Sequence, residues 1–319
     1  MALNIIRGEI PRAQKVVIYG PEGIGKTTLA SQFPDPLFID TEGGTEHFDV
    51  NRLEMPDTWD QLLNMIKEVA ENPDICSTLV IDTADWCEQI AIKHIIERAN
   101  VGSIEDFGYG KGYTYIGEEF ARLLEKLNMV KDAGINVVVT AHAKMRKFEQ
   151  PDEIGAYDRW EMKLTRQSAP LLKEWCDHLL FCNYQTMVVE VDKNSKTKKA
   201  QGGKRVIYTA HRPVWDAKTR AKLPECVDMK FENIASILPE KIQKAAPKRA
   251  EDEKKLQGLM IAYTISEQEL VNLIHEKAPA TKDCKTLKDM PADRIAWSIK
   301  WWNQIVDIIT KSKEEKNNG

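Results

Sequence analysis

The 319-residue sequence predicts an α/β protein with a mostly parallel, doubly wound sheet, followed by a small all-α domain. One observation is a glycine-rich loop between a short apolar run and a helical pattern. The other is the repeated alternation of strand-like runs with amphipathic helical patterns, which is typical of parallel sheets. We therefore divide the chain into a core at 1–238, a linker at 239–257 and a helical C-terminal domain at 258–319.

The glycine-rich loop has the full spacing G-x-x-x-x-G-K-T, with an apolar strand predicted at 15–19 and a helix at 28–33. Backbone N–H groups of such a loop surround phosphate oxygens, and the following helix begins with its positive dipole end. Lys26 is expected to reach the β- and γ-phosphates, and the Thr27 hydroxyl to hold Mg²⁺. The loop thus predicts ATP and Mg²⁺ as cofactors, with nucleotide contacts from Gly20, Pro21, Glu22, Gly23, Ile24, Gly25, Lys26, Thr27 and Thr28.

The remaining elements of the core follow in order. A capping box, in which Thr58 precedes Gln61 by three residues, predicts a helix start, and a further helix is predicted at about 118–131. Apolar and β-branched runs predict further strands, and two runs joined by a Lys-rich turn predict a hairpin. These strands lie at 36–40, 78–82, 136–140 and 177–182, with the hairpin at 186–191 and 205–209.

Chemically useful side chains stand where the predicted strands end. Ligands of doubly wound sheets bind at the carboxyl ends of the strands. Asp82 ends an apolar strand, the arrangement in which a carboxylate holds Mg²⁺. Because Thr83 follows it, a base for hydrolysis has to come from elsewhere, and Glu42 is the best candidate. The alternative for Glu42 is an ordinary solvated loop acid.

These residues also carry a family resemblance. Asp40-Thr41-Glu42-Gly43 resembles the strand end and catalytic glutamate of RecA/RadA-type recombinases, and His142 stands where that family has a γ-phosphate-sensing glutamine. Residues 14–238 are similar to the phage RecA-core ATPases of the Sak single-strand-annealing group. The resemblance implies a RecA-like P-loop NTPase that forms a homo-oligomer, either a filament or a ring. It also implies that Lys218 and Arg220 reach a neighbouring subunit's ATP, unless they form only a basic surface turn.

Two segments have the composition of single-strand DNA sites, at 106–115 and 144–166. Both mix cations, which follow phosphates, with aromatic rings, which stack on bases. The alternative is a pair of flexible loops with exposed rings. The candidate DNA-binding residues are Tyr109, Lys111, Tyr113, Lys144, Arg146, Lys147, Arg159 and Trp160.

The leading hypothesis is an ATP-dependent recombinase or annealing ATPase of phage or prophage type that binds single-stranded DNA. The alternatives are a RecA-fold helicase loader or branch-migration motor, and a nucleotide-gated DNA scaffold with slow hydrolysis. A net charge of −4 restricts nucleic-acid binding to local patches. The six cysteines lack C-x-x-C spacing, and we expect a cytoplasmic protein with no membrane segment. Single-strand-binding protein is an expected partner of the C-terminal domain.

Overall fold

The computed structural model describes residues 8, 10–149, 155–190, 198–239, 245–278, 281, 284–290 and 292–317. The chain divides into two compact units, Met1–Glu240 and Lys241–Gly319, and each is described by itself. Among the described helices, none is both long enough and apolar enough to cross a membrane.

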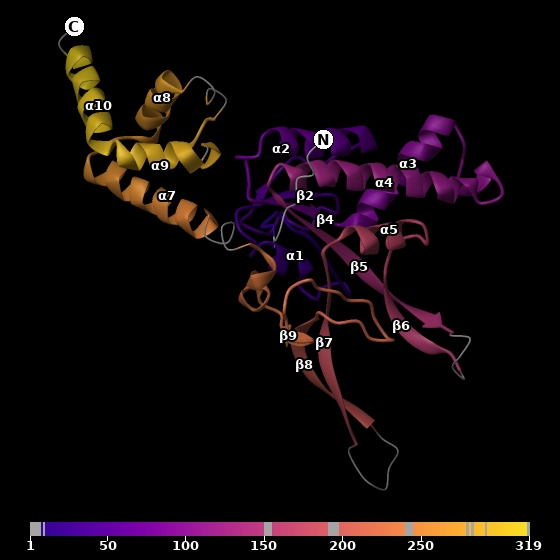
Figure 1. The fold of residues 1–319 in the computed structure, drawn as a ribbon. Helices are drawn as coiled ribbons and strands as arrows, with labels where there is room; N and C mark the ends of the chain where they lie inside the picture. Colours follow the sequence, from indigo (N-terminus) through magenta and orange to yellow (C-terminus); the bar gives the residue numbers. More distant parts are fainter. Residues whose placement is uncertain are drawn as a thin grey trace, which may run out of the picture. The chain divides into compact units, whose positions relative to one another are not determined.

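The first unit is built on a nine-stranded sheet in the order β3-β2-β4-β5-β1-β7-β8-β9, with β6 paired to β5 (Figure 1). The six strands from β3 to β7 run parallel, and β8 and β9 continue the sheet antiparallel, which confirms the predicted mostly parallel sheet. The strands are β1 (Lys15–Gly20), β2 (Pro36–Asp40), β3 (Asn51–Arg52), β4 (Thr78–Asp82), β5 (Asn136–Phe148), β6 (Tyr157–Met162), β7 (His178–Glu190), β8 (Lys198–Tyr208) and β9 (Cys226–Asp228).

Both faces of this sheet are covered, as a doubly wound fold requires. Alternate residues of β1 divide between two cores: Val17 and Tyr19 pack toward α2, α3, α4 and α5, whereas Val16 and Ile18 pack toward α1, η2 and η3. The helices of this unit are α1 (Lys26–Ala30), α2 (Trp59–Glu71), α3 (Ala84–Ala99), η1 (Ile104–Phe107), α4 (Lys111–Asp132), α5 (Ser168–Trp175), η2 (Phe231–Asn233) and η3 (Ala235–Ile237). The Thr58 cap is confirmed, since its side chain accepts a hydrogen bond from the Gln61 N–H.

Two hairpins extend beyond the carboxyl edge of the sheet. β5 and β7 run parallel to β1, so their C-terminal halves project past the end where β1 meets the glycine-rich loop. The predicted strand at 136–140 was too short, because β5 continues to Phe148 and pairs with β6. Solvent reaches both faces of this hairpin, so its sequence lacks the apolar alternation that reveals a half-buried strand. The tips at 150–154 and 191–197 lie outside the described residues.

The candidate DNA segment at 106–115 also contains more regular secondary structure than the sequence indicates. η1 occupies 104–107, and α4 begins at Lys111 rather than near residue 118. Gly112 permits this start, because a Cβ at that position would collide with the Ile104 carbonyl oxygen. Lys111 and Tyr113 therefore lie in the first turn of α4, and only Tyr109 remains in a turn.

The second unit is helical and has its own core. It contains α7 (Ala245–Ala262), α8 (Glu267–Lys277), η5 (Leu287–Asp289), α9 (Ala292–Lys300) and α10 (Trp302–Asn317). The predicted linker at 239–257 is wrong from residue 245 onward, because α7 buries Leu256 and Met260 in this core. A run rich in Lys, Glu and Ala suits an exposed helix as well as it suits a tether, so composition alone misplaced the boundary.

We expect a chain truncated after Glu240 to fold and to keep basal ATP hydrolysis. The two units have separate buried clusters, and every predicted catalytic residue lies in the first unit. Circular dichroism and a steady-state ATPase assay of the truncated chain test this. Loss of either folding or basal turnover would show that the helical unit is structurally required.

Candidate active site

The predicted strand-end residues meet at one edge of the sheet. In register, Gly20 at the end of β1 lies opposite His142 of β5, and Asp40 at the end of β2 lies opposite Asp82 of β4. Because β2, β4, β5 and β1 are consecutive neighbours, these ends form one continuous row. Glu42 follows Asp40 by two residues and stands at the same edge.

The glycine-rich loop begins where the end of β1 packs closely against β7. A Cβ on Gly20 would collide with the carbonyl oxygen of Cys182 on β7, so only glycine fits there. The Lys26 side chain is buried, and its Nζ donates to the carbonyl oxygens of Gly20 and Pro21 at 3.3 and 3.2 Å. Burial lowers the pKa of Lys26, although the nearby acids oppose that shift. The loop thus holds a cation against its own backbone, as the predicted phosphate contact requires.

Thr27 and Asp82 come together as predicted for a magnesium site. The Thr27 hydroxyl donates to Oδ2 of Asp82 at 2.7 Å, and the Thr140 hydroxyl donates to Oδ1. Burial raises the pKa of Asp82, and these two hydrogen bonds oppose the rise. A hydroxyl and a carboxylate are the oxygen ligands that Mg²⁺ prefers, so these residues fit the ion. When bound, Mg²⁺ would neutralise phosphate charge at this position.

Glu42 is held in place by Asp40, whose role the sequence did not reveal. The buried Asp40 carboxylate accepts the N–H groups of Glu42 at 3.0 Å, Gly43 at 2.8 Å and Thr45 at 2.8 Å. Burial raises the pKa of Asp40, but hydrogen bonds from the Thr45 hydroxyl and from these N–H groups outweigh that effect, and the net shift is downward. Burial also raises the pKa of Glu42 itself, with Asp82 and Asp85 adding to the effect. A carboxylate with a raised pKa is a stronger proton acceptor near neutral pH.

His142 lies between two carboxylates. Its Nδ1 is 2.8 Å from Oδ2 of Asp85, and its backbone N–H donates to the other Asp85 oxygen at 2.9 Å. On the opposite side, Nε2 of His142 is 3.9 Å from Oε1 of Glu42. Burial raises the pKa of Asp85, but the bonds to His142 dominate and the net shift is downward. In the sequence, Asp85 is visible only as an acidic residue in the first turn of the helix that follows Asp82. Asp85 was not among the predicted site residues.

Lys218 and Arg220 lie at the opposite edge. The Lys218 backbone exchanges two hydrogen bonds with Leu179, and the Arg220 guanidinium is 3.3 Å from the Asp177 carboxylate. Asp177 adjoins Lys15 at the amino end of β1, so neither cation joins the phosphate loop of its own chain. Arg205 of β8 does approach that loop, since its Nη1 would lie 3.2 Å from a Cβ on Gly25. No motif in the sequence marked Arg205.

Arg220 remains a prediction for a site shared between subunits. A mixture of Arg220→Ala and Lys26→Ala proteins is expected to hydrolyse ATP faster than the sum of its components, because some interfaces would pair two intact halves. The control replaces Arg12 with Ala, since Arg12 binds the same Asp177 carboxylate at 3.1 Å. If the Arg12→Ala mixture behaves identically, or if no complementation appears, Arg220 serves only the ion pair with Asp177.

The predicted DNA-binding residues divide by exposure. Lys147 is exposed on β5, Lys111 is exposed on α4, and Tyr109 is fully exposed. Lys144 is also exposed on β5, although its Nζ donates to the Leu164 carbonyl oxygen at 3.1 Å. Arg146 is half-exposed and lies 3.6 Å from Glu161. The other candidates are committed to protein contacts: Arg159 pairs with Asp216, Trp160 packs against Phe181, and the Tyr113 hydroxyl donates to Glu105.

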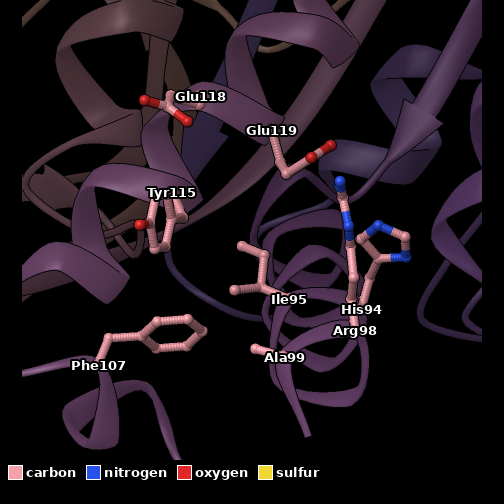
Figure 2. Close-up of a pocket in the computed structure, with 8 residues that line it drawn as sticks. All are labelled: His94, Ile95, Arg98, Ala99, Phe107, Tyr115, Glu118 and Glu119. Carbon is pink, nitrogen blue, oxygen red and sulfur yellow. The ribbon is translucent and has the colours of Figure 1, made fainter. Parts of the chain in front are cut away.

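A separate cavity of about 370 Å³ lies between α3, η1 and α4 (Figure 2). Its walls carry His94 and Arg98 from α3, and Glu118 and Glu119 from α4. Phe107 and Tyr115 also line it. None of the nucleotide-site residues takes part, so this cavity is distinct from the phosphate loop.

The loop, the Thr27–Asp82 pair and the neighbouring acid on this sheet define a P-loop NTPase. The chain belongs to the AAA domain family, which it matches over residues 12–221. This family and the site make it an AAA-type P-loop ATPase. A KaiC-like protein from the archaeon Pyrococcus horikoshii is among the similar solved structures, at 14% identity and a TM-score of 0.37. That comparison covers 68% of this chain and 86% of the archaeal one. Among curated proteins, no match was found.

Proposed function

We propose that this ATPase binds single-stranded DNA and uses ATP to promote its annealing or recombination, as in phage RecA-core enzymes. The observation that carries the proposal is the continuity of β5. The same strand holds His142 beside Glu42 and, beyond it, the exposed cations Lys144 and Lys147. A change at the nucleotide site therefore has a short, direct route to the hairpin.

The hairpin has features that suit a single strand. It projects beyond the carboxyl edge, on the side where the nucleotide would bind. Phe148 and Tyr157 pair edge-on at 5.7 Å beside the cations. Cations that follow a phosphate backbone, together with rings available for stacking, are typical of sequence-tolerant single-strand binding. Because the chain is acidic overall, such binding depends on this local patch.

Coupling between ATP hydrolysis and DNA binding would follow from the position of His142. A γ-phosphate between Lys26 and Glu42 would lie beside the imidazole, and its loss on hydrolysis would change the charge that His142 faces. A ligand shifts an equilibrium only through different contacts with two states. The β5–β6 hairpin supplies an element that two nucleotide states could position differently. Assembly into a filament or ring, and recruitment of single-strand-binding protein by the helical unit, belong to the same proposal.

The direct test is the steady-state ATPase rate with and without single-stranded oligonucleotide, combined with annealing of complementary strands. DNA-stimulated hydrolysis together with ATP-dependent annealing supports the proposal. Directional strand displacement would favour a branch-migration motor or helicase loader. Hydrolysis that neither responds to DNA nor accompanies annealing would favour a nucleotide-gated scaffold.

A second test isolates the hairpin. Replacing Arg146 and Lys147 with Ala is expected to weaken single-strand binding for all sequences alike, because phosphate contacts carry no base information. Two lost contacts should reduce the log–log salt slope by about 1.4, at roughly 0.7 per phosphate. The measurement is fluorescence anisotropy of a labelled oligonucleotide across a salt series, with an ATP analogue present.

The matched control removes two cations elsewhere, Lys67 on α2 and Lys93 on α3. Both lie on exposed helix surfaces and pair with a glutamate one turn away. The control protein should bind DNA with the wild-type slope. If the hairpin variant keeps wild-type affinity and slope, β5–β6 is not on the DNA path, and the segment at 106–115 is the remaining candidate.

A further inference from the structure

We propose that Glu22, Glu42 and His142 form a binding site for a transition-metal cation of the Zn²⁺ class, distinct from the Thr27–Asp82 magnesium position. One donor atom from each of the three side chains lies within 4.8 Å of the other two. Glu22 comes from the glycine-rich loop, Glu42 from the turn after β2 and His142 from β5. The three elements are brought together only by the fold.

The orientation of His142 is the second observation. Its side chain is 8% exposed, and the Asp85 carboxylate accepts a hydrogen bond from Nδ1–H. Asp85 also accepts the backbone N–H of His142, so the carboxylate that holds the imidazole is itself held by the backbone of the same residue. Among the described residues, Nε2 has no hydrogen-bond partner, and it faces Glu42. Histidines that bind metals are commonly held this way, with one ring nitrogen on a carboxylate and the other on the ion.

The donor set selects the class of cation. One imidazole nitrogen and two carboxylate oxygens suit Zn²⁺ and its neighbours, whereas Mg²⁺ favours oxygen ligands alone. Zn²⁺ binds such ligands at about 2.0–2.2 Å in tetrahedral geometry, which separates ligand atoms by about 3.4 Å. The present 3.9 Å between His142 and Glu42 needs only a small closure. Glu22 is exposed and the Glu42 side chain is 31% exposed, and both side chains are long enough to supply it.

Occupancy would have a chemical consequence. A cation bound to the Glu42 carboxylate would withdraw the lone pair that the proposed base needs, so the metal would act as an inhibitor of hydrolysis. This consequence rests on the proposed role of Glu42, whereas the binding itself does not. The site is therefore tested in the absence of nucleotide and DNA.

The experiment titrates Zn²⁺ into the full-length chain against a chromophoric chelator. All proteins carry Cys226→Ser, because that exposed thiol is a competing zinc ligand. We expect one equivalent to bind, and His142→Gln and Glu22→Gln each to weaken binding by at least about tenfold. Asp85→Asn, which changes only the support of His142, should weaken it by about 10- to 100-fold. His47→Gln, which removes an exposed histidine from the turn after β2, should bind as the parent does.

Cobalt provides an independent readout, because Co²⁺ in a low-symmetry nitrogen and oxygen site has visible absorption bands. Those bands should appear with the parent and disappear with His142→Gln, while circular dichroism confirms that both proteins are folded. Absence of stoichiometric Zn²⁺ binding, or equal affinity in the parent, His142→Gln and Glu22→Gln, overturns the proposal. DNA-stimulated hydrolysis measured in Mg²⁺ with no Zn²⁺ present reports on the proposed function separately, so failure of one is not mistaken for failure of the other.

Discussion

Replacing Lys26 with Ala should reduce ATP hydrolysis by about 10²–10³-fold or more, the usual cost of removing one preorganised charge from a developing anion. Lys26 is the buried cation of the phosphate loop, and its Nζ already lies within hydrogen-bonding distance of the loop carbonyls. Phosphate oxygens would replace those carbonyl contacts with charge-assisted ones. The measurement is steady-state turnover together with the thermal shift produced by Mg·ATP.

Loss of Lys26 should also remove most of that thermal shift, since a ligand stabilises the fold only in proportion to how tightly it binds. The control is Lys93→Ala, which removes a lysine from the exposed surface of α3 and should behave as wild type. An undiminished thermal shift and turnover in the Lys26→Ala protein would mean that nucleotide binds elsewhere.

Glu42→Gln should bind Mg·ATP with a normal thermal shift and hydrolyse it about 10²–10⁴-fold more slowly, the range expected for loss of a general base. The amide preserves the size of the side chain and leaves the turn that Asp40 holds through the backbone unchanged. Glu46→Gln is the matched control, because Glu46 is exposed in the same turn. Wild-type turnover by Glu42→Gln would exclude Glu42 as the water-activating residue.

The pH profile gives the same assignment a second readout. The pKa of Glu42 is raised by burial, so its carboxylate takes up a proton at a higher pH than an ordinary glutamate does. Only the ionised form accepts a proton from water, so the turnover of the wild-type chain should fall as pH decreases through that raised pKa. The residual turnover of Glu42→Gln should lack this acid limb.

Much of this nucleotide site was predictable from the order of residues. The glycine-rich loop, Asp82 and Glu42 each follow a recognisable strand, and parallel strands bring their carboxyl ends to one edge. The register that places Gly20 opposite His142 and Asp40 opposite Asp82 confirms that expectation. The helix cap at Thr58 was predicted for the same local reason, since a cap and its partner are three residues apart.

Other residues had no local signal. Asp40 looked like an ordinary strand end, and its carboxylate became a support for Glu42 only because the following turn folds back onto it. Arg205 is 180 residues from Gly25 and reaches it through the pairing of β7 with β8. Arg159 and Trp160 have the composition of a DNA site, yet the packing of Asp216 and Phe181 against them decides their contacts.

The sequence by itself therefore determined the chemistry of the phosphate loop and the class of fold, because both depend on short-range patterns: glycine spacing, apolar runs and caps. Tertiary structure alone decided which side chains surround the loop and which cations stay in solvent. Those outcomes depend on contacts between strands that are distant in the chain, such as Asp85 with His142 and Arg220 with Asp177. Hydrophobic burial selects the arrangement of the strands, and the partner of each charged group follows from that arrangement.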